Sequence, residues 1–250
     1  MGYIMSINKI GIIGAVCSVA AIAQPASAFD VTGGEVSFGY SAFSEENELS
    51  RLTFDGAVEY GFAPSFGVQL DVAHTTFGAT SLNTNSATLH AVYHVNDSAA
   101  LGAFATLESA GIASNHIGNV AFYGLEAGYD ANALVFEGYW GTGEESGVSI
   151  RTLGGEAGYR INDRFSVGVS HDRLTLEDGE EITLHNTALR GSYDAENGVE
   201  FYAEVGRAGI QVPSESISES TNFFGLGLTY TFGRGATFGK RTVTQIVPGL

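Results

Sequence analysis

Residues 221–232 of the chain read TNFFGLGLTYTF. In an extended strand, this stretch places small or polar residues on one face and apolar residues on the other, namely Phe224, Leu226, Leu228, Tyr230 and Phe232. A strand needs this pattern when one face meets lipid and the other meets water. A strand of a soluble β-sandwich can alternate in the same way, so the rest of the chain decides between the two.

The same pattern repeats from Phe29 onward, where about ten alternating residues are followed by a connection rich in Asn, Asp, Gly, Ser or Pro. A membrane-spanning strand takes about 9–11 residues. The repeats predict one all-β domain over residues 29–232, and ten or fourteen strands stay open as alternatives to twelve. The twelve expected strands are 30–43, 49–62, 66–77, 87–95, 99–108, 119–129, 133–141, 148–161, 165–176, 182–193, 199–208 and 221–232.

The connections between these strands alternate in length. The odd-numbered connections tend to be longer, and they lie at residues 44–48, 78–86, 109–118, 142–147, 177–181 and 209–220. Every second one is tight, at residues 63–65, 96–98, 130–132, 162–164 and 194–198. An even strand number, with short turns at one end and longer loops at the other, is typical of outer-membrane barrels. A Greek-key sandwich has no reason to sort its connections in this way, whereas a soluble up-and-down barrel could do so.

The two faces of the expected strands differ in charge. One face is apolar, as in Leu52, Phe54, Val58, Tyr60 and Phe62. Aromatic residues gather near the strand ends, and aromatic belts at two membrane interfaces predict that clustering. We therefore expect the apolar face to meet lipid and the charged face to line the lumen. The charged face carries Glu35, Asp55, Glu59, Asp71, Glu108, Glu126, Glu137, Glu156, Asp172, Glu200 and Glu204, with Arg51, Arg160 and Arg190 as its main basic residues.

Residues 1–28 are typical of a secretory signal peptide, with Lys9, an apolar run over residues 10–23 and small residues at 26–28 before the expected cleavage site. The run is shorter than the roughly 20 residues that a membrane-spanning helix needs. Cleavage leaves 28 acidic and 10 basic residues, a net charge of about −18, and no cysteine. An exported chain without cysteine is not held by disulfides. Its acidity argues against nucleic acid and anionic membrane surfaces as partners, and against an oligoanion substrate.

Through its signal peptide, its unequal connections and its final strand, the chain resembles bacterial outer-membrane β-barrel and porin-like proteins. The resemblance covers residues 29–232 and implies a transmembrane up-and-down antiparallel β-barrel in the bacterial outer membrane. It also implies that the apolar series from Phe224 to Phe232 is the insertion signal that the barrel assembly machinery reads. The sequence departs from the usual pattern because residues 233–250 follow Phe232. This stretch is basic and contains no acid, and we expect a periplasmic extension.

The inward carboxylates predict an acidic aqueous lumen that favours cations over anions, as rings of Asp and Glu do in pores. Twelve strands are expected to enclose a narrow pore. Inward small residues leave room for it, at Gly39, Gly102, Gly124, Gly128, Ser166, Gly168 and Ser170. A packed polar interior is the alternative. The acids expected near the middle of the lumen are Glu59, Asp71, Glu126, Glu137, Glu156 and Glu204, and the basic lining is expected from Arg51, Arg160 and Arg190.

The sequence therefore predicts a porin-like channel for passive diffusion of small cationic or neutral solutes. The barrel is expected to contact outer-membrane lipid and lipopolysaccharide, as a monomer or as a trimeric homo-oligomer. A non-conducting structural or adhesive barrel is the alternative, and an outer-membrane lipid hydrolase is a less favoured one. No cofactor and no metal site are expected.

The hydrolase alternative has few local candidates in the sequence. In the run Ser170-His171-Asp172, neighbouring strand residues point to opposite faces, so His171 cannot contact both neighbours as a catalytic triad requires. His90 and His94 share a face, but four residues of strand separate them by roughly 13 Å. That distance is too long for two ligands of one metal ion. A triad assembled across strands stays open.

Overall fold

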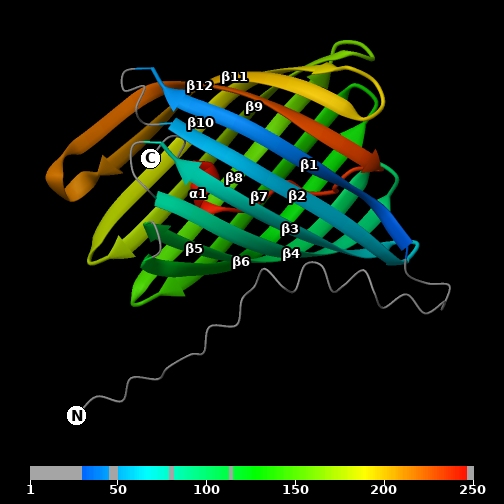
Figure 1. Ribbon diagram of the computed structural model, residues 1–250. Coiled ribbons are helices and arrows are strands. Elements are labelled where there is room, and N and C mark those ends of the chain that lie inside the picture. Colours follow the sequence, from blue (N-terminus) through cyan, green and yellow to red (C-terminus); the bar gives the residue numbers. More distant parts are fainter. Residues whose placement is uncertain (1–29, 45–49, 79–81, 113–114, 247–250) are drawn as a thin grey trace.

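The computed structural model describes residues 30–44, 50–78, 82–112 and 115–246, so the expected signal peptide lies outside the described residues. Twelve antiparallel strands follow one another in chain order round a closed barrel (Figure 1). This confirms the predicted all-β up-and-down barrel and its strand number. The strands are β1 (Asp30–Phe43), β2 (Ser50–Ala63), β3 (Phe66–Phe77), β4 (Leu82–Asn96), β5 (Ala99–Ile112), β6 (Asn115–Ala131), β7 (Leu134–Glu145), β8 (Val148–Arg160), β9 (Phe165–Asp178), β10 (Glu180–Asp194), β11 (Val199–Val212) and β12 (Ile217–Gly233).

The final strand, β12, closes the barrel by pairing with β11 on one side and with β1 on the other. Leu228 lies opposite Phe201 in β11 and opposite Phe38 in β1. Closure pairs the backbone of both terminal strands, so neither leaves an open edge in a medium that cannot hydrogen-bond to it. The five residues of the expected insertion signal point away from the lumen, as the alternation predicts; that they act as a signal stays a prediction.

Several strands run further than the alternation in the sequence indicated, mostly at the end where longer connections were expected. β4 begins at Leu82, β5 continues to Ile112, and β9 and β10 are joined by Gly179 alone, at a φ of +71°. At the β5–β6, β7–β8 and β9–β10 hairpins the expectation of longer connections is therefore wrong, because the extra residues are paired strand. Hydrophobic alternation stops where lipid stops, whereas the backbone ladder continues into water.

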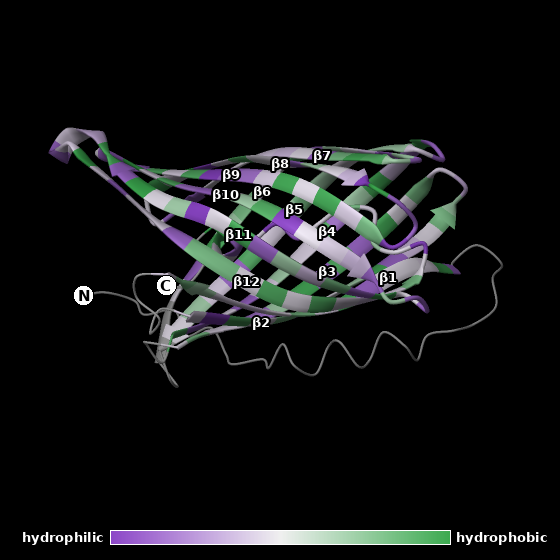
Figure 2. Cartoon of the chain, turned by 90° about the horizontal axis from the view of Figure 1, so that it is seen from above, coloured by the Kyte–Doolittle hydropathy of each residue, from purple (hydrophilic) through white to green (hydrophobic). Residues whose placement is uncertain are grey.

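The outer wall of the barrel is apolar around its middle. Apolar residues alternate along each strand with small or polar ones, as Figure 2 shows. Leu125 is 63% exposed, Leu226 is 56% exposed and Trp140 is 50% exposed. A continuous apolar surface of this size is typical of contact with a membrane. None of the described helices is long and apolar enough to cross a membrane.

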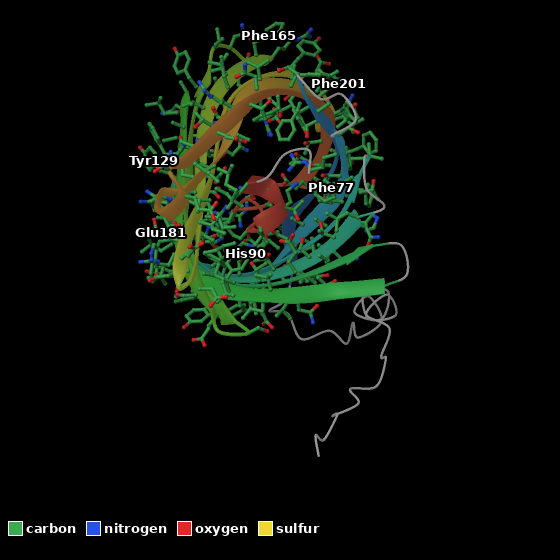
Figure 3. All side chains as sticks on the ribbon, turned by 90° about the vertical axis from the view of Figure 1, so that its left-hand side faces the viewer. Phe77, His90, Tyr129, Phe165, Glu181 and Phe201 are labelled. Atoms are coloured by element: carbon green, nitrogen blue, oxygen red, sulfur yellow. The ribbon has the colours of Figure 1, made fainter. Side chains whose placement is uncertain are left out.

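The chain continues beyond β12 and turns back into the barrel. Residues 234–246, which we call the lumenal tail, end in the short helix α1 (Val243–Ile246). Figures 1 and 3 show α1 inside the ring of strands. Phe238 and Ile246 are each 1% exposed. Much of the buried core of the protein therefore lies between this tail and the inner wall.

Candidate functional site

The six acids expected near the middle of the lumen all lie on the inward face of the wall. Glu59, Asp71 and Glu126 are buried, while the other three line an open cavity together with the three predicted arginines. These positions follow from the alternation of the strands. Their action on a passing solute stays a prediction. The cavity-lining members of the set are Glu137, Glu156, Glu204, Arg51, Arg160 and Arg190.

Arg241 is the main ionic contact of the lumenal tail. Its guanidinium donates to Glu126 at 3.0 Å and to Glu137, and it lies 4.3 Å from the centre of the Tyr139 ring. The Arg241 side chain is only 3% exposed. A buried guanidinium needs both charge partners and hydrogen bonds to offset its lost hydration. Here the wall supplies two carboxylates and an aromatic face.

His90 extends this network across the wall. Its Nδ1 lies 2.7 Å from a carboxylate oxygen of Glu126, and its Nε2 lies 3.1 Å from one of Asp71. Both carboxylates are satisfied when both ring nitrogens carry a proton, as in the imidazolium form. The ring also stacks on Phe238 of the tail, with centroids 6.2 Å apart; Figure 3 labels His90 on the wall. Asp71 therefore supports the tail through His90.

Phe238 occupies space that glycines leave on the inner wall. A Cβ atom added to Gly102 would lie 2.5 Å from the Phe238 ring, and one added to Gly128 would lie 3.4 Å from it. Any side chain at position 102 would therefore collide with Phe238. The room that the sequence analysis assigned to a pore at Gly102 is filled by the tail, whereas Gly39 and Gly168 line the open cavity.

Gln69 holds the backbone of the tail. Its amide nitrogen donates to the Phe238 carbonyl at 2.6 Å, and its amide oxygen accepts from the backbone N–H of Thr237 at 2.9 Å and of Phe238 at 3.1 Å. Gln69 is completely buried. Buried backbone groups need hydrogen-bond partners, and one side chain supplies three of them here.

We expect Gln69→Ala to loosen the tail without opening the barrel. Each backbone group left unpaired costs about 1–3 kcal/mol, so the tail should exchange its amide hydrogens faster near Phe238. Hydrogen–deuterium exchange measured by mass spectrometry tests this. Thr53→Ala is the matched control, because the Thr53 hydroxyl bonds only to Thr75 on the wall, at 3.1 Å. Equal exchange at residues 236–240 in both variants would contradict the assigned role.

Two further contacts fix the end of the tail. Glu108 accepts from the backbone N–H of Val243 at 2.7 Å and of Thr244 at 3.2 Å. Arg51 donates to the Thr244 carbonyl at 2.7 Å. Nearer the middle, Lys240 pairs with Asp55 at 2.6 Å. Asp55, Glu108 and Arg51 come from β2 and β5, so widely spaced parts of the wall converge on one short segment.

The sequence analysis did not place the tail in the lumen. It expected residues 233–250 to extend into the periplasm, and the described part of this stretch instead runs along the inner wall. The feature of the sequence that could have placed the tail in the lumen was its charge. The tail carries Arg234, Lys240 and Arg241 and no acid, and the inward face has many more acids than arginines.

A cavity of about 1140 Å³ remains beside the lumenal tail. The tail forms one side of it, and inward residues such as Gly39, Tyr202 and Glu204 form the other. Ten carboxylates and six Lys or Arg side chains line it. Glu204 is paired with Arg190 at 2.9 Å, while Glu35 and Glu156 make no hydrogen bond or ion pair within the described chain. The cavity is therefore polar, with an excess of negative charge.

Apolar side chains fill the lumen nearer the β9–β10 hairpin. Ile246 of the tail packs with Ile150 and Leu174, and Phe43 packs with Phe223. These five residues, which we call the apolar collar, are each 7% exposed or less and do not line the cavity. The lumen is thus open and charged beside the middle of the tail and packed around its end.

The candidates for catalysis or metal binding lie apart from one another. Ser170 and Asp172 face inward, whereas His171 faces outward and bonds to Thr187 at 2.7 Å. His90 and His94 both face inward but have separate partners, since His94 lies 3.0 Å from Glu59. Within the described ranges, no three His, Cys, Asp or Glu side chains are grouped so that they could hold a metal ion.

Comparisons with known proteins agree with this geometry at the level of the fold. No family model and no curated protein sequence matches the chain. Among solved structures, a KdgM porin is 18% identical, with a TM-score of 0.52, over 79% of this chain and 99% of its own. A NanC porin is 12% identical, with a TM-score of 0.54, over 79% and 98%. An outer-membrane channel from Pseudomonas putida F1 is 13% identical, with a TM-score of 0.51, over 84% and 97%. The chain therefore has the fold of the outer-membrane porins.

Proposed function

We propose that the protein is an outer-membrane channel for passive diffusion of small cationic or neutral solutes, and that solutes move through the cavity beside the lumenal tail. The observation that carries this proposal is the polar cavity of about 1140 Å³ inside a closed barrel with an apolar outer wall. A cavity of this size holds many water molecules. The porin fold of the similar structures supports the same function class.

The charge of the cavity supports a preference for cations. Its lining has ten carboxylates against six Lys or Arg side chains. Glu35, Glu156 and Glu200 have no hydrogen-bond or ion-pair partner within the described residues, so their carboxyl groups face the cavity. Carboxylates around a pore lower the electrostatic energy of a passing cation. One similar structure is a KdgM porin in complex with disordered oligogalacturonate; such a polyanion would be repelled by this lining.

The same proposal includes the location and partners of the barrel. Residues 1–28 would direct export, and the barrel assembly machinery would read the outward series that ends at Phe232. The apolar outer wall supports contact with outer-membrane lipid and lipopolysaccharide. The barrel would work as a monomer or as a homo-oligomer such as a trimer.

A non-conducting structural or adhesive barrel is the second candidate. The observation that favours it is the apolar collar, which packs the lumen around Ile246. In this case the tail would be a permanent part of the core, and conductance would be absent. The channel proposal instead requires that ions pass the collar.

We expect the open channel to favour cations, and the double variant Glu35→Gln/Glu156→Gln to favour them less. Reversal potentials in a planar bilayer under a salt gradient measure this ratio. Both substitutions remove cavity charge without removing a hydrogen bond or an ion pair. Glu215→Gln is the control, because Glu215 lies in the exposed turn η3 (Pro213–Glu215). A reversal potential that shows anion preference in the unmodified protein would overturn the selectivity proposal.

A further inference from the structure

Basic side chains cluster on the outer wall, away from the lumen. Arg151, His171, Arg173, His185 and Arg207, which we call the basic patch, lie on four consecutive strands from β8 to β11. Arg173 is directly opposite His185, while His171 and Arg207 both lie opposite Thr187. Such a cluster is unexpected in a chain with a net charge of −17.

The basic patch begins where the apolar band of the outer wall ends. On β9 the outward residues Phe165, Val167 and Val169 are 50%, 41% and 49% exposed, and His171 and Arg173 follow them. From residue 165 to residue 173 a strand covers about 26 Å. With the usual tilt of barrel strands, this is about 20 Å across a membrane, close to the height of an apolar band. The patch therefore lies at the level of lipid headgroups.

The arginines of the basic patch retain free hydrogen-bond donors. Arg207 donates to the Ser220 hydroxyl at 2.8 Å, and Arg173 donates to the Thr183 hydroxyl at 3.4 Å. Within the described chain neither pairs with a carboxylate, whereas Arg151 pairs with Glu177 at 2.6 Å. A guanidinium has five N–H donors. Carboxylate partners are found instead at Arg160, Arg164, Arg190 and Arg241, while Arg51 in the lumen donates to the Thr244 carbonyl.

We propose that the basic patch binds the phosphate groups of an anionic membrane lipid, at the end of the barrel where the β9–β10 hairpin lies. Guanidinium groups hold phosphate oxygens through paired hydrogen bonds, and basic side chains near a membrane surface attract anionic headgroups. The inference rests on the proposed membrane location but not on conduction.

A lipid fits better than free phosphate because apolar surface adjoins the patch. Leu189 lies opposite Val169 on one side and opposite Val205 on the other. These residues are 58%, 49% and 58% exposed, in the same order. They form an outward apolar row one step along the strands from His171 and Arg207. One molecule with phosphates and acyl chains can therefore contact both surfaces.

The test measures lipid binding to the refolded barrel in zwitterionic detergent by native mass spectrometry. The probes are lipid A with both phosphates, the same lipid after phosphate removal, and inorganic phosphate. We expect the unmodified barrel to retain phosphorylated lipid A selectively. The double variant Arg173→Gln/Arg207→Gln should bind it at least about tenfold more weakly. Arg164→Gln is the matched control, because Arg164 is an exposed arginine at the opposite end.

Several outcomes would overturn the proposal. One is equal retention of phosphorylated lipid A by the double Gln variant, and another is equal retention of dephosphorylated lipid A by the unmodified barrel. Displacement of the lipid by an equal concentration of inorganic phosphate would show that the patch binds phosphate itself and not a lipid. The variant Arg173→Lys/Arg207→Lys keeps both charges but not the paired hydrogen bonds, so it should bind more strongly than the double Gln variant and more weakly than the unmodified barrel, which separates headgroup recognition from a folding defect. Single-channel conductance should be the same in all these variants. Loss of lipid binding can therefore be distinguished from failure of the channel proposal.

Discussion

Deletion of residues 235–250 is expected to raise the single-channel conductance of the protein several-fold. The deletion removes Phe238 from the space beside Gly102 and removes Ile246 from the apolar collar. It leaves every strand intact, since β12 ends at Gly233. The backbone pairing of β12 with β1 ends at Gly233 and Arg234, and both residues remain after the deletion. A wider aqueous lumen should therefore form inside an unchanged wall.

Planar-bilayer recordings of the two proteins measure this increase, and the heat-dependent mobility of the barrel in gel electrophoresis checks that both are folded. Glu215→Ala, in the exposed turn η3, controls for a general disturbance of the hairpins. Equal conductance of the folded full-length and truncated proteins would show that the tail does not obstruct the pore. No conductance from either protein would overturn the channel proposal and favour the structural or adhesive barrel.

The deletion should also increase cation preference. Removal of the tail takes Lys240 from Asp55 and takes Arg241 from Glu126 and Glu137. These carboxylates would then face an aqueous lumen without their cationic partners. The tail thus both obstructs the lumen and neutralises its carboxylates. Recordings under a salt gradient measure both effects, as conductance and as reversal potential.

Arg241→Leu is expected to release the lumenal tail from the wall. Glu126 and Glu137 would lose their guanidinium partner, and removing one member of a buried ion pair costs about 3–5 kcal/mol. Leucine fills part of the same volume, so the effect comes mainly from the unpaired carboxylates. Lys240→Ala is the matched control, because Lys240 is 32% exposed and has one ionic partner. We expect a smaller effect from Lys240→Ala, because it leaves one carboxylate without its partner whereas Arg241→Leu leaves two.

A cysteine placed at Ile246 reports the release. Cys17 is the only cysteine of the sequence and lies in the expected signal peptide, so a chain that begins at Phe29 would carry a single label site. Ile246 is 1% exposed in the docked tail, and a maleimide should react with Ile246→Cys slowly. Adding Arg241→Leu should accelerate labelling strongly, and adding Lys240→Ala should accelerate it little. Equal labelling rates in the two double variants would contradict the central role of Arg241.

The alternation in the sequence was sufficient to assign both faces of the barrel. Leu226 and Leu228 of the quoted stretch face outward and Gly225 and Gly227 face inward, as their positions two residues apart require. The pairing of β12 with β1 also follows, because a spanning sheet cannot leave its terminal strands unpaired. The positions of the strand ends could not be predicted from the alternation. Hydrogen bonding continues through polar residues such as Asn83 and Ser218, where the hydrophobic signal is absent.

The sequence by itself determined the class of the fold, because strand alternation and closure depend on residues next to one another in the chain. Only the tertiary structure decided what occupies the lumen. Gln69 and Phe238, whose contact holds the tail, are 169 positions apart. Arg207 and Arg173 likewise belong to one patch only because β9, β10 and β11 pair in one register. Contacts between residues far apart in the chain depend on the closed barrel. The barrel fixes both the space beside Gly102 and the charged residues that surround that space.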